Sequence, residues 1–209
     1  MLTESGRLEA FSDGVLAIAI TLLVLDLRPP QLRPGESLAR GLADQWESYA
    51  AYVVSFLVIG VIWLNHNTLF SLIRYVDRWV LVSNLVLLMV VAAIPFPTQV
   101  LAKYLTAGDA DSRTAALLYT ATMLAMAVAF TLLFAAVSRR QDLMRPGVDA
   151  ARVHAGLPRF GAGVVIYAAT MLVALVSAPI CLLVHFGIAA YYVFDQVGAR
   201  LAKAAGGGV

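Results

Sequence analysis

The sequence is poor in charged residues and nearly free of cysteine. Of its 209 residues, 13% are charged and 61% are hydrophobic, and the mean hydropathy is +0.82. A typical soluble domain has about 25% charged residues, so this chain has too few polar side chains to coat a globule in water. The composition excludes a soluble enzyme and a disordered linker, and it predicts an all-α membrane protein in contact with the lipid bilayer.

The other scarcities narrow the expected chemistry further. The single cysteine, Cys181, excludes a disulfide framework and a cysteine-based metal site, and it is expected to be a small buried hydrophobe. A net charge of +2 leaves no basic face for nucleic acid. No cleavage site follows a basic leader, so a removed signal peptide is not expected. HExxH, GxSxG and glycine-rich phosphate motifs are missing, which predicts no enzyme activity and no cofactor.

Apolar runs predict the membrane spans, because about 20 residues of helix cross a hydrocarbon core. The last run, residues 160–197, nearly suffices for two helices, and Ser177-Ala178-Pro179 supplies a break because proline ends helices. We therefore expect a single domain over residues 1–209 with six transmembrane helices. An alternative has five spans, with one long last helix and an interfacial tail after His185. The predicted spans are residues 10–27, 49–70, 79–102, 114–137, 160–178 and 180–198.

Basic residues on the connecting segments predict the orientation. With both termini inside, the cytoplasmic segments carry ten Lys and Arg residues and the external segments carry five. Cytoplasmic loops of membrane proteins carry the excess of Lys and Arg, so both termini are expected to be cytoplasmic. Residues 28–47 are expected to form an external loop, and residues 203–209 a disordered tail.

Ionisable groups inside the spans require an explanation, because they are costly in lipid. Under this topology, Asp13, His66, Asn84 and Asp195 lie at a similar depth near the cytoplasmic side. They are expected either to form interhelical hydrogen bonds, worth about 1 kcal/mol or less each, or to form a proton relay or ion site. His185 is expected to be an ordinary interfacial residue near the outer end of the last span.

The first span is the most informative segment. Ser12 and Asp13 suit a first helical turn, where their side chains could bond free amides. At about 100° per residue, Gly14, Ile18, Thr21 and Leu25 fall on one narrow stripe, with Leu22 at its edge and Asp13 pointing away. A packing helix would give the same pattern. Around a symmetry axis, however, the stripe would form apolar rings that gate by dewetting and a ring of hydroxyl oxygens, with Asp26 at the outer mouth.

Two motifs resemble the transmembrane protein 175 family of potassium channels. The first is Arg7-x-x-x-Phe11-Ser12-Asp13-Gly14, followed by Ala17-Ile18 and the run from Thr21 to Asp26. The second is Trp63-x-Asn65-His66-Asn67-x-x-Phe70, with Asn84 and Pro95-Phe96-Pro97-Thr98 in the next span. The resemblance covers the first half of the chain in detail and the second half only in its pattern of spans.

The resemblance implies a homotetramer whose first helices line a central pore. By position, Ile18, Leu22 and Leu25 would form the hydrophobic constriction, and Thr21 with Ile18 would set selectivity. A structural network of Arg7, Phe11, Ser12, Asp13, His66 and Asn84 would pack the first helix, with His66 and Asn84 as the partners of its motif. The single-repeat form implies a bacterial plasma membrane.

The leading hypothesis is therefore a potassium-selective channel that conducts passively, with no bound metal beyond the permeating monovalent cation. One alternative is a proton-linked conductance or transporter that uses Asp13 and His66, because imidazole titrates near neutral pH. Another is a membrane scaffold that does not conduct, in which the stripe on the first helix is only a seam between subunits.

Overall fold

The computed structural model describes residues 2–206, including their side chains except those of Asp109 and of residues 195–206. The described chain is almost wholly helical, with two very short strands. The elements, in order, are β1 (Thr3–Glu4), α1 (Gly6–Leu22), the 3₁₀ helix η1 (Leu23–Asp26), α2 (Leu38–Ala43), α3 (Trp46–Phe70), β2 (Tyr75–Val76), α4 (Arg78–Ala93), α5 (Pro95–Tyr104), α6 (Asp109–Ser138), the 3₁₀ helix η2 (Gln141–Leu143), α7 (Ala150–His154), α8 (Leu157–Ala174) and α9 (Ala178–Gly206).

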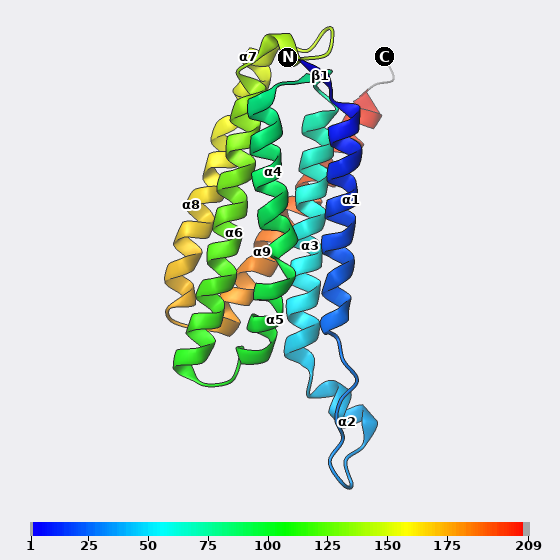
Figure 1. Ribbon diagram of the computed structural model, residues 1–209. Helices are drawn as coiled ribbons and strands as arrows, with labels where there is room; N and C mark the ends of the chain where they lie inside the picture. Colours follow the sequence, from blue (N-terminus) through cyan, green and yellow to red (C-terminus); the bar gives the residue numbers. More distant parts are fainter. Residues whose placement is uncertain (1, 207–209) are drawn as a thin grey trace.

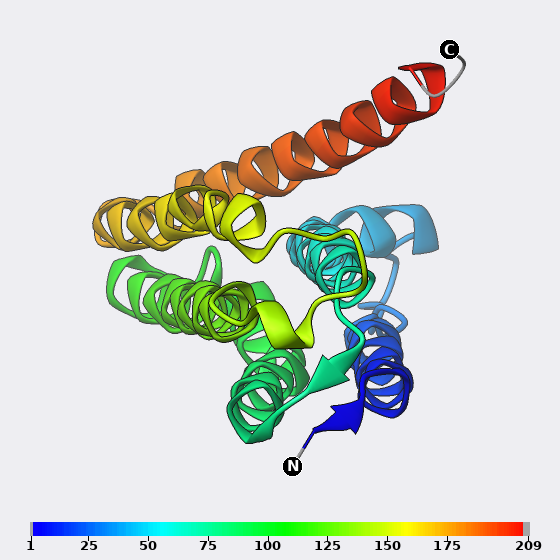
Figure 2. The same ribbon diagram turned by 90° about the horizontal axis from the view of Figure 1, so that it is seen from above.

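The long helices stand side by side as a bundle, in which α3 lies next to α1 (Figure 1). Seen from above, α1 and α4 lie on one side of the bundle and α8 and α9 on the other (Figure 2). α9 crosses the bundle obliquely and ends at the same end at which α1 begins (Figure 1).

Five segments are long and apolar enough to cross a membrane. They are Gly6–Asp26, Trp46–Phe70, Arg78–Tyr104, Ala110–Ser138 and Ala150–Ala174, and the apolar part of α9, Ala178–Phe194, is shorter. The prediction of a helical protein with several membrane spans is confirmed. The alternative of one long last helix is wrong, because α8 ends at Ala174 and α9 begins at Ala178 with Pro179 in its first turn.

Two of the helical segments differ in detail from the expected spans. α1 begins at Gly6, four residues before the predicted start, so Ser12 and Asp13 lie in the helix interior instead of its first turn. The third span is divided between α4 and α5 at Ile94. Pro95 and Pro97 follow at once, and a proline has no backbone N–H to continue the helical ladder.

The end of the bundle at which α1 begins is tied together by backbone pairing that the sequence did not predict. β1 pairs antiparallel with β2, and Ile73 forms an isolated bridge with Met144. The backbone N–H of Arg74 donates to Leu143 at 2.8 Å, and that of Arg145 donates to Leu72 at 2.9 Å. The N-terminus and two inter-helix connections therefore form one small cap on the bundle.

The segment expected to be an external loop contains the short helix α2. Ser37 caps it by accepting a hydrogen bond from the backbone of Arg40. A Cβ at Gly41 would lie 2.7 Å from Leu32 and 3.1 Å from Pro30. The loop therefore folds back closely on α2 at Gly41, where an added Cβ would have to displace the side chain of Leu32.

His185 is not an interfacial residue, contrary to expectation. It is fully buried on α9, its ring lies between Tyr119 and Tyr167, and its Nδ1 lies 2.8 Å from the carbonyl oxygen of Cys181. α9, which carries His185, packs against α3, α6 and α8, so this position lies inside the bundle. Cys181 is buried as expected and is a free thiol.

The expected tail falls partly on the last helix. Residues 203–206 belong to α9, and residues 207–209 lie outside the described part of the chain. The side chain of Asp195, which was expected at the same depth as Asp13, His66 and Asn84, also lies outside the described residues.

Candidate functional site: the exposed face of α1

One face of α1 packs against the rest of the subunit, and the opposite face is exposed. Leu8, Ser12, Leu16 and Ala19 are buried, and Leu23 continues this face into η1. The other side of the helix carries the predicted stripe. α1 therefore has the two-faced pattern of a surface helix, but with apolar residues on both faces.

The predicted pore residues are exposed in the single subunit. Ile18 is 60% exposed, Leu25 is 66% exposed and Leu22 is 41% exposed, while Thr21 lies among them on the same face. No other helix of the described subunit covers this stripe. An apolar face left open by a subunit is typical of a surface that contacts another copy, lipid or a hydrophobic conduit.

Thr21 is the one polar side chain within this part of the stripe, and its hydroxyl has a defined direction. Its Oγ1 lies 2.8 Å from the carbonyl oxygen of Ala17 and 2.9 Å from that of Ile18. The hydroxyl proton is therefore donated back to its own helix. The lone pairs of the Thr21 oxygen remain available outward, as an oxygen ligand for a cation requires.

The reverse side of α1 is held by a buried chain of hydrogen bonds. Ser12 donates to the carbonyl of Leu8 at 2.8 Å, and Nδ2 of Asn84 donates to Ser12 at 2.9 Å. The remaining amide oxygen of Asn84 lies 2.9 Å from Nε2 of His66. That oxygen can only accept, so His66 donates from Nε2. Ser12, His66 and Asn84 are all fully buried, and their hydrogen bonds join α1, α3 and α4.

Asp13 has a different partner from those expected. Its Oδ1 accepts a hydrogen bond of 3.0 Å from the indole N–H of Trp63. Trp63 precedes His66 by three residues, so both lie on the side of α3 that faces α1. The tryptophan was visible in the sequence motif, but its role as donor was not predicted, because helix spacing alone does not give the distance between two helices.

The remaining residues of the predicted network lie at the outside of the subunit. Arg7 is exposed and Phe11 is 54% exposed, so neither joins the buried chain of Ser12, Asn84 and His66. At the other end of the stripe, Asp26 accepts a hydrogen bond of 2.7 Å from Gln99 of α5. This bond fixes the Asp26 carboxylate just beyond Leu25. Like the Asp13–Trp63 bond, it was not predicted from the sequence.

The fold defines a helical protein with several membrane spans. One face of its first helix is bonded to the rest of the subunit, and the opposite face is exposed. The family model described as "Endosomal/lysosomal potassium channel TMEM175" matches residues 7–95. These residues contain α1, the chain of Ser12, Asn84 and His66, and the Asp13–Trp63 bond.

Full-length relatives show the same likeness over nearly the whole chain. The chain is 49% identical to Potassium channel B446_29190 of Streptomyces collinus, over 98% of both chains. It is 38% identical to Potassium channel Cha6605_3372 of Chamaesiphon minutus, over 91% of this chain and 94% of that one. The crystal structure of a lysosomal potassium-selective channel TMEM175 homolog from Chamaesiphon minutus matches with a TM-score of 0.82 at 36% identity, over 92% of this chain and 97% of that chain. This chain belongs to the TMEM175 family.

Proposed function

We propose that the protein is a potassium-selective channel in which the exposed stripe of α1 lines a pore between identical subunits. The observation that carries this proposal is the exposure of Ile18, Thr21 and Leu25 on one face of a helix whose opposite face is locked by buried polar bonds. The naming of two relatives as potassium channels, and of a solved relative as potassium-selective, supports the choice of ion.

The assembly that suits this face is a homotetramer, the form implied by the family resemblance. Closed rotational symmetry brings the same face of every subunit to one axis. Ile18, with Leu22 and Leu25, then forms apolar rings that exclude water when narrow. Thr21 adds a ring of hydroxyl oxygens whose outward lone pairs replace part of the hydration shell of the ion.

The outer end of the stripe suits cation entry. Asp26 is held there by Gln99, and a ring of such carboxylates raises the local cation concentration. We place both termini in the cytoplasm of a bacterium and the chain in its plasma membrane, because most of the Lys and Arg residues of the connecting segments lie at the end where α1 begins. The activity is passive conduction, without catalysis and without a cofactor beyond the permeating potassium.

Reversal potentials across a bilayer test this function. The purified protein, reconstituted between unequal potassium and sodium solutions, should give a potential close to that of potassium. Ile18→Asn should raise conductance, and Thr21→Ala should weaken selectivity. Thr122→Ala is the control, because the Thr122 hydroxyl also bonds a carbonyl of its own helix but lies on α6. If the variants of α1 behaved like Thr122→Ala, the pore would not be lined by this face.

The proton-linked alternative has less support. The hydrogen bonds run from His66 through Asn84 and Ser12 to a backbone carbonyl, where they end. Asp13 bonds to an indole N–H, which does not pass a proton onward. Proton flux that disappears in His66→Ala at fixed pH would nevertheless favour this alternative, and silent bilayers from well-folded tetramers would favour a scaffold.

A further inference from the structure

The subunit has two unlike flanks beside α1. Seen from above, α3 and α4 pack against different sides of α1 (Figure 2). If the exposed stripe of α1 faces a rotation axis, the flank of α4 and α5 faces the copy on one side, and the flank of α1 and α3 faces the copy on the other. In a ring with more than two subunits, these unlike flanks must meet each other.

The flank of α4 and α5 carries a ridge of large apolar side chains. Met89 is 67% exposed, and Leu85 and Phe96 are also exposed. Their spacings of four and seven residues place them along one side of the helical segment. We call these three residues the ridge.

The same flank contains the break in the third span, between Ala93 and Pro95. Pro97 has no backbone N–H, so the carbonyl oxygen of Ala93 lacks the donor that a continuous helix supplies four residues later. Ala93 is itself exposed. Irregular backbone at membrane depth occurs where protein or water covers it, and not against lipid. Because the ridge is apolar, another protein chain is the covering that suits this flank.

The flank of α1 and α3 carries a groove. The groove encloses about 460 Å³ of empty space, part of which is open to solvent. Ala17 of α1 and Gly60 of α3 are its smallest lining residues, and a Cβ at Gly60 would have no neighbour within 4 Å. Asp13 also lines the groove and is partly exposed. A carboxylate at membrane depth is costly against lipid, so this flank too suits a protein neighbour.

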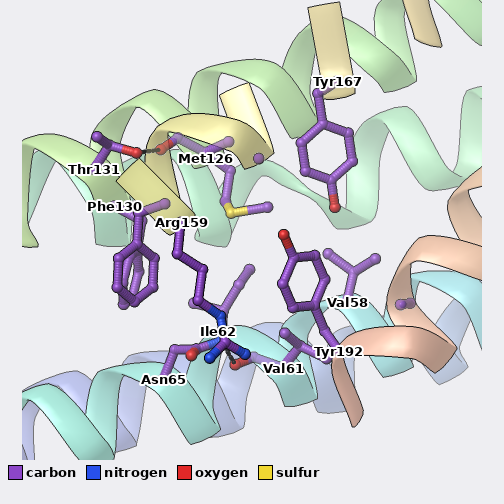
Figure 3. A pocket seen from close by; sticks show the side chains of 14 residues that line it. Val58, Val61, Ile62, Asn65, Met126, Phe130, Thr131, Arg159, Tyr167 and Tyr192 are labelled. Atoms are coloured by element: carbon purple, nitrogen blue, oxygen red, sulfur yellow. Dashed lines mark hydrogen bonds between the residues drawn. The ribbon is translucent and has the colours of Figure 1, made fainter. Parts of the chain in front are cut away.

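The pocket shown in Figure 3 lies elsewhere in the subunit. Residues of α3, α6, α8 and α9 line it, among them Ile62, Phe130 and Tyr167, and no described residue of α1 does. An axis at the exposed stripe of α1 therefore leaves this pocket away from the contact between copies, and the groove is the hollow that adjoins α1.

Ridge and groove lie at the same depth. Met89, Ala17 and Gly60 are 11, 11 and 10 residues from the ends of their helices at which α1 begins. At about 1.5 Å per residue, all three are about 15–17 Å from that end of the bundle. The bond between Asp26 and Gln99 supports this alignment of the first and third spans. Rotation about an axis along the membrane normal does not change depth, so Met89 of one copy is level with Gly60 of the next.

We propose that the ridge of one copy packs into the groove of the next copy, with Met89 over Gly60. Large side chains that fill the gaps of a facing helix surface are the usual form of helix packing. The inference rests on the proposed pore, because it takes the position of the axis from the exposed stripe of α1. It places the Asp13–Trp63 bond at a contact between subunits, since both residues line the groove.

Crosslinking of the full-length protein in membranes tests the contact. The double variant Met89→Cys with Gly60→Cys is treated with a short bis-maleimide and separated on a denaturing gel. Each copy carries both halves of the contact, so dimers, trimers and tetramers should appear, and neither single variant should give them. The native Cys181 is buried and is present in every variant.

The matched control is Val128→Cys with Gly60→Cys. Val128 is 40% exposed and lies 10 residues from the same end of the bundle, but on α6, outside both flanks. This pair should give no crosslinked bands.

A pair of size changes tests the packing itself. Gly60→Leu fills the groove and should lower the fraction of tetramer that light scattering detects in detergent, with helical content unchanged. Adding Met89→Ala, which shortens the ridge, should restore part of the tetramer. Gly187→Leu is the control, because a Cβ at Gly187 of α9 also has no neighbour within 4 Å. If Gly60→Leu did not fold, the crosslinking would still decide.

Several results would overturn the proposal. Dimers from Met89→Cys alone would show that like flanks meet, and a double variant without crosslinks, or with no more than the Val128 pair, would remove the contact. A folded Gly60→Leu protein that stayed fully tetrameric would remove the groove. Potassium conduction separates this inference from the proposed function. A conducting channel without the Met89–Gly60 crosslink would contradict the contact alone, and a crosslinked tetramer that did not conduct would contradict the channel alone.

Discussion

The side-chain amide of Asn84 donates to the hydroxyl of Ser12 at 2.9 Å, between residues 72 positions apart in the chain. Ser12 and Thr21 are nine residues apart, so they project from α1 about 180° from each other. The hydrogen bond between Ser12 of α1 and Asn84 of α4 therefore lies on the side of α1 opposite the Thr21 hydroxyl. Buried hydrogen bonds therefore set the rotation of α1 about its own axis, and that rotation decides which of its side chains are exposed.

Replacing Asn84 should destabilise the subunit. Asn84→Leu keeps the approximate volume but leaves the buried Nε2–H of His66 without its acceptor, which costs about 1–3 kcal/mol. Thermal unfolding of the purified protein should show the loss, and Ser83→Ala, one residue earlier on α4, should not. In the double variant with His66→Phe, the loss should be smaller than the sum of the two single losses. Additive losses would contradict the bond.

The bond between Trp63 and Asp13 should make a smaller contribution. Trp63→Phe keeps an aromatic ring but removes the indole N–H, and a half-exposed hydrogen bond of this kind contributes about 1 kcal/mol. Asp13→Asn retains an acceptor oxygen and should cost less. Chemical or thermal unfolding of the two variants measures the order. A greater loss for Asp13→Asn than for Trp63→Phe would show that Asp13 has another, stronger partner.

The hydroxyl of Thr21 should matter for selectivity more than its shape does. Thr21→Ser keeps the oxygen and its bond to the preceding turn, so the preference for potassium over sodium should persist. Thr21→Val has the shape of threonine without the oxygen and should lower that preference. Bi-ionic reversal potentials give the comparison directly. Equal selectivity in the two variants would exclude the oxygen as the ion ligand.

Acid should loosen the connection between α6 and α7. Hydrogen bonds from Arg140 lower the pKa of Asp142 below its ordinary value of 3.8, and Arg140 also pairs with Asp77, which caps α4. A lowered pKa stabilises the folded state above the ordinary value, and this stabilisation disappears as pH falls through the folded value. Melting temperatures should therefore decline below about pH 4 in wild type, and part of that decline should be absent in Arg140→Gln. An identical acid profile in both proteins would contradict the role of the pair.

Much of the helical layout follows from the sequence because the bilayer imposes simple rules. Apolar length predicted a helical protein with several spans, and Pro179 predicted the break between α8 and α9. The stripe of Ile18, Thr21 and Leu25 followed from helical periodicity alone, and the structure leaves all three exposed.

The remainder depends on distances between helices, which periodicity does not contain. The burial of His185 follows from the packing of α9 against α3, α6 and α8, and the partner of Asp13 follows from how closely α1 approaches α3. The strands β1 and β2 have two residues each, too few for an alternating pattern. Ser12 was expected to accept from free amides, but α1 begins earlier at Gly6, and Ser12 donates to Leu8 instead.

Cadmium block of Ile18→Cys tests most directly whether this position faces its own copies across the pore. The native Cys181 is buried, so wild type should be insensitive. Thiols that converge at the axis should bind the metal, and the potassium current of Ile18→Cys should be blocked. Leu132→Cys, at an exposed position on α6, should conduct unblocked. An Ile18→Cys channel that conducts normally in cadmium, or that is blocked no more than Leu132→Cys, would contradict a pore lined by α1.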